Sequence, residues 1–125
     1  MKKMLNYGLF LFALIFIDAA LSKVVAQDVH KVAPTMYKVL SDTMGVRLME
    51  AVYKPGEASA MHAHPDFALY IMEGGKIEIT NTAGNKQVVD FKKGMGVVMP
   101  ADTHTAKNVG TTTVRLVVVE INRNP

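Results

Sequence analysis

Two stretches decide the fold: Gly56-Glu57-Ala58-Ser59-Ala60-Met61-His62-Ala63-His64-Pro65 and, further along the chain, Gly94-Met95-Gly96-Val97-Val98-Met99-Pro100-Ala101-Asp102-Thr103-His104-Thr105-Ala106-Lys107-Asn108. Side chains two residues apart on a strand point to the same face, so an extended His62 and His64 present their imidazoles together. His104 on a neighbouring strand would add a third imidazole. Beyond residue 30 the chain has no other histidine, so this clustering predicts a metal site.

The chain between and around these stretches reads as short strands separated by turn residues. In residues 76–82, Ile77 and Ile79 alternate with polar side chains, as in a half-buried strand, and Ala83-Gly84-Asn85 predicts a hairpin turn. No segment keeps a helical period over three turns. The expected strands are 36–40, 46–54, 67–72, 76–82, 86–91, 94–99, 104–108 and 113–122, with a turn at 41–45. This pattern favours an all-β sandwich or barrel.

The first 26 residues are typical of an export signal. Lys2 and Lys3 precede an unbroken apolar run over residues 9–17, and Val24-Val25-Ala26 suits a signal peptidase, which predicts cleavage before Gln27. An uncleaved N-terminal anchor is the alternative. The division is therefore a signal peptide over 1–26 and one folded domain over 27–125, in a protein that is periplasmic or secreted.

Composition excludes several kinds of site. The chain has no cysteine, so it has no disulfide, no thiolate ligand and no thiol nucleophile, and any metal must be held by nitrogen and oxygen. Residues 1–26 carry three lysines and one aspartate, so their removal lowers the formal charge from +3 to +1. No basic cluster occurs later in the chain. We therefore expect neither nucleic acid as a partner nor a membrane after cleavage of the signal.

The two histidine stretches resemble the motifs of the cupin superfamily. Its first motif runs Gly, five residues, His-x-His, three or four residues, Glu, six residues, Gly, and Gly56, His62, His64 and Gly75 fall on it. Its second motif runs Gly, five residues, Pro-x-Gly, two residues, His, three residues, Asn, and it is matched by Gly94, Pro100, His104 and Asn108. The resemblance covers residues 36–122 and implies a small double-stranded β-helix barrel.

The chain departs from these motifs at two places. With the three-residue spacing, Ala68 stands where the motif has its glutamate, which normally supplies a fourth ligand. Asp102 replaces the glycine of the second motif, and one residue is missing before His104. Asp66 and Glu50 are the carboxylates considered as replacements for the lost ligand, and neither is expected to reach the metal.

Three imidazoles without a carboxylate would leave the charge of a divalent ion uncompensated. Mn, Fe, Ni, Zn and Cu all accept such a nitrogen ligand set. An open, positive site favours a small anionic molecule that chelates through two atoms. The resemblance points the same way, because three-histidine cupins include thiol dioxygenases and a β-diketone-cleaving dioxygenase, whereas other cupins eliminate, isomerise or epimerise acids and sugars.

The alternation along residues 67–72 predicts which side chains form the wall of the site. On this register Ala68, Tyr70 and Met72 face inward beside the histidines, with Met61 and Met99 lining the same cavity. Tyr70 is then the candidate catalytic residue, as a group that orients substrate or passes a proton, with plain packing as the alternative. For the methionines, ordinary core packing is the alternative.

Three further polar residues receive structural interpretations. His30 follows the predicted cleavage site in a segment expected to be a tail, and it is assigned no role. Asp102 is interpreted as a turn-forming residue, and Asn108 is expected to fix a turn through its side chain.

Two classes of function remain open from the sequence. The first is a metal-dependent dioxygenase, lyase or isomerase, and the second is a non-catalytic barrel that binds a small acid or sugar, with or without metal. Residues 67–72 and 116–119 are apolar on both faces, which predicts that the outer face is covered as well, by a second sheet or by a second subunit. A homodimer is the expected assembly.

Overall fold

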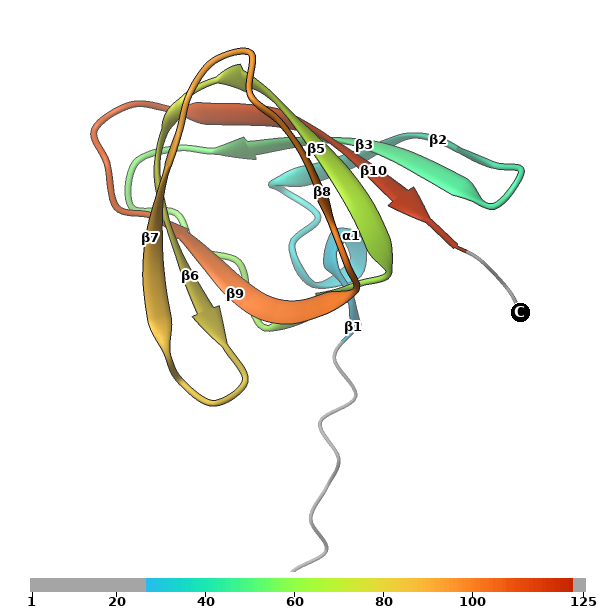
Figure 1. Ribbon diagram of the computed structural model, residues 1–125, viewed down its shortest axis with the longest axis horizontal. Coiled ribbons are helices and arrows are strands. Elements are labelled where there is room, and N and C mark those ends of the chain that lie inside the picture. The colour runs from blue at the N-terminus through green and yellow to red at the C-terminus, as the bar shows by residue number, and fades with distance from the viewer. Residues whose placement is uncertain (1–26, 123–125) are drawn as a thin grey trace, which may run out of the picture.

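The alternating segments of the chain fold into two five-stranded sheets that face each other, with short turns between successive strands (Figure 1). The structure, a computed structural model, describes residues 27–122. Its elements are β1 (Gln27–Asp28), α1 (Val29–Val32), β2 (Tyr37–Thr43), β3 (Val46–Tyr53), β4 (His62–His64), β5 (Asp66–Glu73), β6 (Gly75–Asn81), β7 (Lys86–Phe91), β8 (Gly96–Met99), β9 (Asp102–Asn108) and β10 (Val114–Ile121). Every strand expected from the sequence is present.

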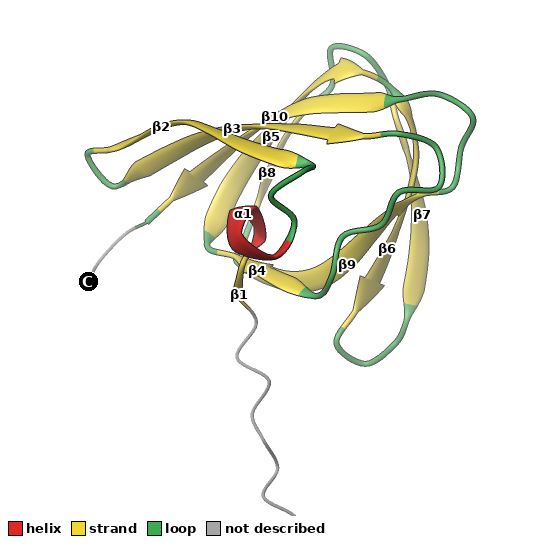
Figure 2. Ribbon diagram, turned by 180° about the vertical axis from the view of Figure 1, so that it is seen from behind, coloured by secondary structure: helices red, strands yellow, loops and turns green. Residues whose placement is uncertain are grey.

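One sheet has the strand order β1-β4-β9-β6-β7 and the other the order β2-β3-β10-β5-β8. The pairs are antiparallel except for β1 with β4, which is parallel. Strands that follow one another in the chain often lie in opposite sheets, so the chain crosses repeatedly between the two layers (Figure 2). The prediction of an all-β barrel is confirmed.

Local turn chemistry accounts for the hairpins. At the β6–β7 turn, Asn81 Oδ1 accepts hydrogen bonds from the backbone N–H groups of Ala83 and Asn85, and Gly84 supplies a φ of 84°. The turn predicted over 41–45 is shorter than expected, because β2 continues to Thr43. Met44 and Gly45 alone make the turn, both with positive φ, which is the geometry of a two-residue hairpin loop.

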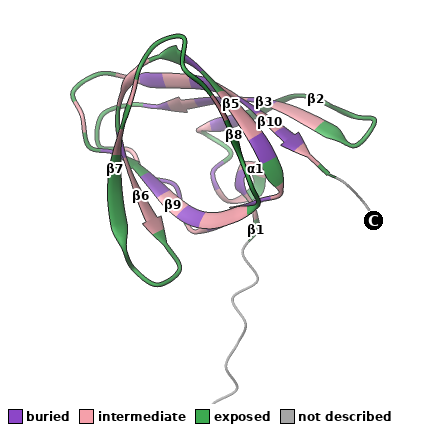
Figure 3. Ribbon diagram, in the orientation of Figure 1, coloured by how far each residue is buried: buried purple, intermediate pink, exposed green. Residues whose placement is uncertain are grey.

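The hydrophobic core fills the space between the two sheets, and buried residues concentrate on the central strands (Figure 3). Apolar side chains at alternate positions of β3 and β10 point inward from one sheet, and they meet a smaller set from β6 and β9. The buried apolar residues are Val29, Ala33, Tyr37, Met49, Ala51, Tyr53, Phe67, Ile71, Ile77, Ala106, Val114, Leu116 and Val118.

Residues 27–32, expected to be a tail, are instead part of the fold. β1 pairs with the histidine strand β4, with Gln27 opposite His62, and Val29 of α1 is fully buried. The expectation that His30 lies in a tail is therefore wrong. The predicted signal peptide lies outside the described residues. Within residues 27–122, no helix has the length and apolar character needed to cross a bilayer.

Candidate metal centre

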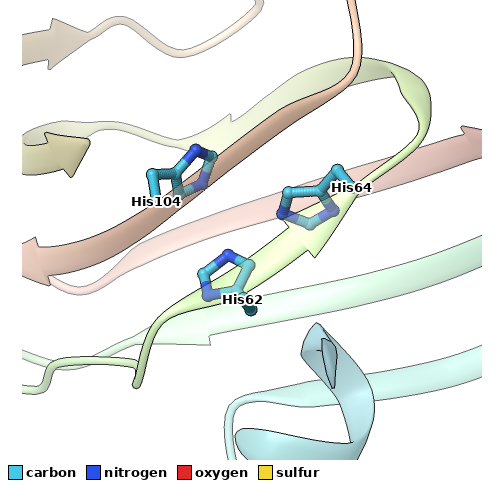
Figure 4. Close-up of side chains that lie close together, drawn as sticks. All are labelled: His62, His64 and His104. Carbon is cyan, nitrogen blue, oxygen red and sulfur yellow. The ribbon is translucent and has the colours of Figure 1, made fainter. Parts of the chain in front are cut away.

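The pairing of β4 with β9 brings the three histidines together. β4 places His62 and His64 on one face, and the antiparallel register sets His62 directly opposite His104. All three residues are buried, His62 completely. The three side chains come from the paired strands β4 and β9 and lie close together (Figure 4). The convergence predicted from the sequence is confirmed.

The rings are close enough for one ion to reach all three. Ring centroids lie 4.8 Å apart for His62 and His64, 4.8 Å for His62 and His104, and 5.4 Å for His64 and His104. One nitrogen from each ring lies within 4.8 Å of the other two. Small torsional adjustments would bring these nitrogens to a common ion at the usual distance of about 2.1 Å.

The hydrogen bonds of the Nδ1 atoms fix which nitrogen is free. Nδ1 of His62 donates to the carbonyl oxygen of Ala60 at 2.8 Å. Nδ1 of His64 donates to Glu120 Oε1 at 2.6 Å, and Nδ1 of His104 donates to Asp102 Oδ2 at 2.6 Å. Because carbonyl and carboxylate oxygens accept, the proton of each neutral ring lies on Nδ1. Each Nε2 therefore keeps its lone pair, the arrangement found in histidines that ligate metals.

The partner of His64 is held by a chain of charges that reaches the surface. The side chain of Glu120 is 2% exposed, and its second oxygen accepts from Arg47 Nη1 at 3.2 Å. Arg47 also pairs with Asp42 at 2.8 Å and with Asp28 at 3.6 Å. The buried carboxylate is thus compensated by a guanidinium, which offsets part of the cost of its burial.

Burial and hydrogen bonding set the protonation of the site. Burial, reinforced by the two neighbouring histidines, lowers the pKa of His62 to about 4. Burial also lowers the pKa of His104, although Asp102 opposes this shift. The hydrogen bond from His104 lowers the pKa of Asp102. At neutral pH, His62 and His104 are therefore neutral and Asp102 is ionised.

The donor set fits a divalent transition metal. His62 Nε2 is buried and has no hydrogen-bond partner among the described residues, and an unpaired buried acceptor is costly unless something binds it. Three imidazole nitrogens, on two rings of which a carboxylate binds Nδ1, form a recognised ligand shell for such an ion.

A cavity of about 360 Å³ adjoins the histidines, between the two sheets. His64 and His104 line it, whereas His62 lies behind them. Tyr37 and Tyr53 line it as well, and their hydroxyl groups are 2.9 Å apart. Burial raises the pKa of both phenols, so both stay protonated at neutral pH. The Tyr37 ring centroid lies 6.0 Å from that of His62. Two phenols and two of the three imidazoles therefore line the cavity, with Tyr37 next to the third.

The sequence profile described as "Cupin domain" matches residues 49–120, which include both histidine stretches. The chain belongs to the cupin family. The double-stranded β-helix expected from the motifs is confirmed by this match and by the two facing sheets. No curated protein matches the chain.

Solved cupin structures share the fold at low sequence identity. A cupin domain from Bordetella pertussis Tohama I has a TM-score of 0.65 and 22% identity, over 70% of this chain and 93% of that chain. An uncharacterized conserved protein with a double-stranded β-helix domain from Klebsiella pneumoniae subsp. pneumoniae MGH 78578 has a TM-score of 0.57 and 24% identity, over 71% and 77%. An RmlC-like cupin family protein from Methanocaldococcus jannaschii has a TM-score of 0.57 and 20% identity, over 69% and 78%. These similarities establish the fold alone.

The inward register predicted for β5 is wrong by one residue. Phe67, Leu69 and Ile71 point to the barrel interior, and Phe67 packs against His64 with ring centroids 4.7 Å apart. Tyr70 lies on the outer face with 54% of its surface exposed, away from the cavity and the histidines. The placement that made Tyr70 a catalytic candidate is therefore corrected.

The same correction applies to the other residues assigned to the inner wall. Ala68 and Met72 lie on the outer side of β5 with Tyr70, and Met61 does not line the cavity, whereas Met99 does. With the four-residue spacing that the cupin motif also allows, Leu69 takes the glutamate position. Leu69 lines the cavity, so an apolar residue still stands where the family has its carboxylate.

The other polar residues singled out from the sequence lie where they were expected, with one exception. Glu50 pairs with Arg115 on the outer side of β3, and Asp66 Oδ1 accepts from the backbone N–H of Ala101 at 3.0 Å, so neither joins the histidines. Asn108 fixes the turn before β10, because its Nδ2 donates to the Thr112 carbonyl and its Oδ1 accepts from Gly110 N–H. The exception is Asp102, interpreted as a turn former, which instead begins β9 and orients His104.

Sequence reasoning missed three residues of this site: Glu120, Tyr37 and Tyr53. A signal for Glu120 was present, because it continues the alternating series of Val114, Leu116 and Val118 and is the one charged residue on that inward face. The two tyrosines carried no comparable signal. They lie on different strands, and only the pairing of β2 with β3 brings them together.

Proposed function

We propose that this cupin holds one divalent transition-metal ion through Nε2 of His62, His64 and His104, and that it acts on a small anionic molecule that chelates the ion through two atoms. The observation that carries this proposal is the set of three Nδ1 hydrogen bonds, which leaves Nε2 free on each of three clustered imidazole rings. Mn, Fe, Ni, Zn and Cu are the candidate ions.

The residues of the site divide the chemistry between them. A bound ion would supply Lewis acidity and open coordination positions on its cavity side. Glu120 and Asp102 keep the ligating rings in the correct tautomer. Tyr37 and Tyr53 carry protonated hydroxyl groups and line the cavity together with His64 and His104, and we assign to them the role first given to Tyr70, orienting the ligand or passing a proton. The reaction class is a dioxygenase-, lyase- or isomerase-type conversion.

Metal analysis of the purified protein tests this proposal. We expect about one equivalent of a transition metal after reconstitution with each candidate ion in turn, with loss of the ion in a His62→Ala/His104→Ala variant. The matched control is His30→Ala, because His30 is the one remaining histidine and lies outside the cluster. Retention of the metal in the double variant, or equal loss in the control, contradicts the assignment.

The second candidate function is non-catalytic capture of a small acid or sugar in the same cavity. The observation that favours it is the single polar end of the cavity, which could hold the anionic group of a small acid without converting it. The two candidates differ in product formation: saturable binding of a chelating ligand without product by the metal-loaded protein would favour capture.

We propose further that the protein is exported and acts in the periplasm or outside the cell. The basic start, the apolar run and the small residues before Gln27 support this location. Expression of the full chain in a bacterial host, followed by mass determination of the purified protein, tests it. A chain that begins at Gln27 is expected, and a full-length chain retained in the membrane would support the anchor instead.

A homodimer is the proposed assembly, formed through the outer face of the β5 sheet. Val98 of β8 is 80% exposed and lies beside Ala68, next to the half-exposed Tyr70. Exposed apolar and aromatic side chains gathered on one face are typical of protein interfaces. Sedimentation should give a dimer that Val98→Asp converts to a monomer, whereas Val88→Asp on the other sheet leaves it intact. A wild-type monomer contradicts the assignment.

A further inference from the structure

The wall of the cavity is apolar almost throughout. Both sheets contribute to it, β6 and β7 from one side and β5, β8 and β10 from the other. The side chains Leu69, Ile77, Ile79, Val89, Phe91 and Val97 belong to this wall. Burial of an apolar ligand body against such a surface contributes favourable free energy of binding. Ligand hydroxyl groups would lose their hydrogen bonds to water there and find no hydrogen-bond partner among these apolar side chains.

Charged groups on the wall are confined to the histidine end. Among the described residues that line the cavity there is no lysine and no arginine, and the only carboxylate is Asp102, which is held by His104. Gln87 is the one neutral amide, and the two tyrosines lie with the histidines. A second negative group on a ligand would therefore meet no cation, and burying it unpaired would be costly.

The wall is apolar even beside the metal ligands. Leu69 stands at the family's glutamate position, and Phe67 packs on His64. The part of a bound ligand that extends away from the ion would thus enter an apolar space directly, with no polar group between the ion and that space.

On the basis of the proposed metal site, we propose that the ligand has one chelating, singly anionic head and an uncharged apolar body. The head lies at the three histidines and the body lies between β6–β7 and β5–β8. This class excludes sugars, sugar acids, phosphorylated compounds and dicarboxylates, which the sequence alone left open.

Hydroxamates test this inference, since the hydroxamate head that they share is a singly anionic two-atom chelator of Zn²⁺. Calorimetric titration of the zinc-loaded protein would compare acetohydroxamate, which is little more than the head, with three six-carbon ligands: hexanohydroxamate, adipic monohydroxamate and gluconohydroxamate. Burial of four further methylenes predicts that hexanohydroxamate binds roughly 100-fold more tightly than acetohydroxamate. The ligands with a terminal carboxylate or with hydroxyl groups should gain nothing over acetohydroxamate.

A charge placed on the wall should reverse this preference. Val97→Lys puts an ammonium group on the cavity side of the edge strand β8, and the control Val88→Lys puts it on the exposed outer side of β7. We expect Val97→Lys to weaken hexanohydroxamate and strengthen adipic monohydroxamate, with neither change in the control.

The outcomes separate the two proposals. If zinc and acetohydroxamate bind but the four further methylenes of hexanohydroxamate tighten binding less than about threefold, or the adipic or gluconic ligand binds more tightly than hexanohydroxamate, the metal site stands and this inference fails. If neither zinc nor any of the other four candidate ions binds, or acetohydroxamate binds equally without a metal, the proposed function fails and this inference falls with it.

Discussion

Replacing Glu120 with glutamine removes one negative charge and leaves the size of the side chain unchanged. Glu120 Oε1 lies 2.6 Å from His64 Nδ1, and both side chains are almost completely buried. Its other oxygen binds Arg47, which keeps its contacts with Asp42 and Asp28 in the variant. The substitution therefore changes the environment of one ligating ring and leaves the fold around it in place.

The expected loss follows from the hydrogen bond. A hydrogen bond to a charged group contributes about 1.5–3 kcal/mol and a neutral one about 0.5–1.5, so the variant loses about 1 to 1.5 kcal/mol of support for the correct ring orientation. Glutamine can also present its amide N–H₂ to Nδ1, which would move the ring proton to Nε2 and block coordination by His64. Together these effects predict a loss of about 10- to 100-fold in zinc affinity, the range found for partners of metal-bound histidines.

Competition with a chromophoric zinc chelator measures this loss directly. Glu50→Gln is the matched control, because Glu50 pairs with Arg115 on the outer face and should leave the affinity unchanged. Chemical unfolding of the metal-free variant shows whether it remains folded. A folded Glu120→Gln protein whose zinc affinity stays within about threefold of wild type would refute the argument that this carboxylate positions His64.

Three further predictions concern pH, charge at the motif position and the tyrosines. Burial lowers the pKa of His62 from its ordinary 6.5 to about 4, so between these pH values the unfolded metal-free chain binds a proton that the folded chain does not. The stability that this difference contributes should be complete above pH 6.5 and fall by about 3 kcal/mol toward pH 4. Urea unfolding would detect this loss, and a His62→Gln variant should lack it. The lowered pKa of His104 changes the stability in the same direction. Leu69→Glu should slow zinc loss to a chelator and weaken acetohydroxamate, while Ala68→Glu on the outer face does neither; equal effects would show that the register on β5 is wrong. Tyr37→Phe should lower turnover or ligand affinity about 10-fold or more with the metal retained, whereas Tyr70→Phe leaves both unchanged.

The strands and the histidine cluster could be predicted from the sequence because both depend on local patterns. Alternation with a period of two identifies a half-buried strand such as 76–82, and turn residues such as Gly84 mark its end. His62 and His64 share a face on any strand. To predict that His104 lies beside His62 and His64, one further fact was needed, the separation of the two cupin motifs along the chain.

The inward register of β5 could not be predicted, for a physical reason. Residues 67–72 are apolar on both faces of the strand, so their pattern does not distinguish inside from outside. The side is set by long-range pairing, in which Leu69 lies opposite Val97 of β8 and Val118 of β10. A shift of one residue exchanges the two faces of a strand, and for this reason the prediction placed Tyr70 inside and Leu69 outside.

The position of the carboxylates explains why an ion at this site would need a ligand from solution. In the cupin motif a glutamate joins the histidines and supplies one negative charge to the metal. Here Leu69 stands at that position, and the charges lie one step further out, on Glu120 and Asp102 behind two of the imidazoles. These carboxylates strengthen the rings as ligands, yet they occupy no coordination position. The coordination positions on the cavity side of the ion are therefore open to an anion from solution. The apolar wall beyond Leu69 then selects among anions, because the rest of a bound molecule must lie against it.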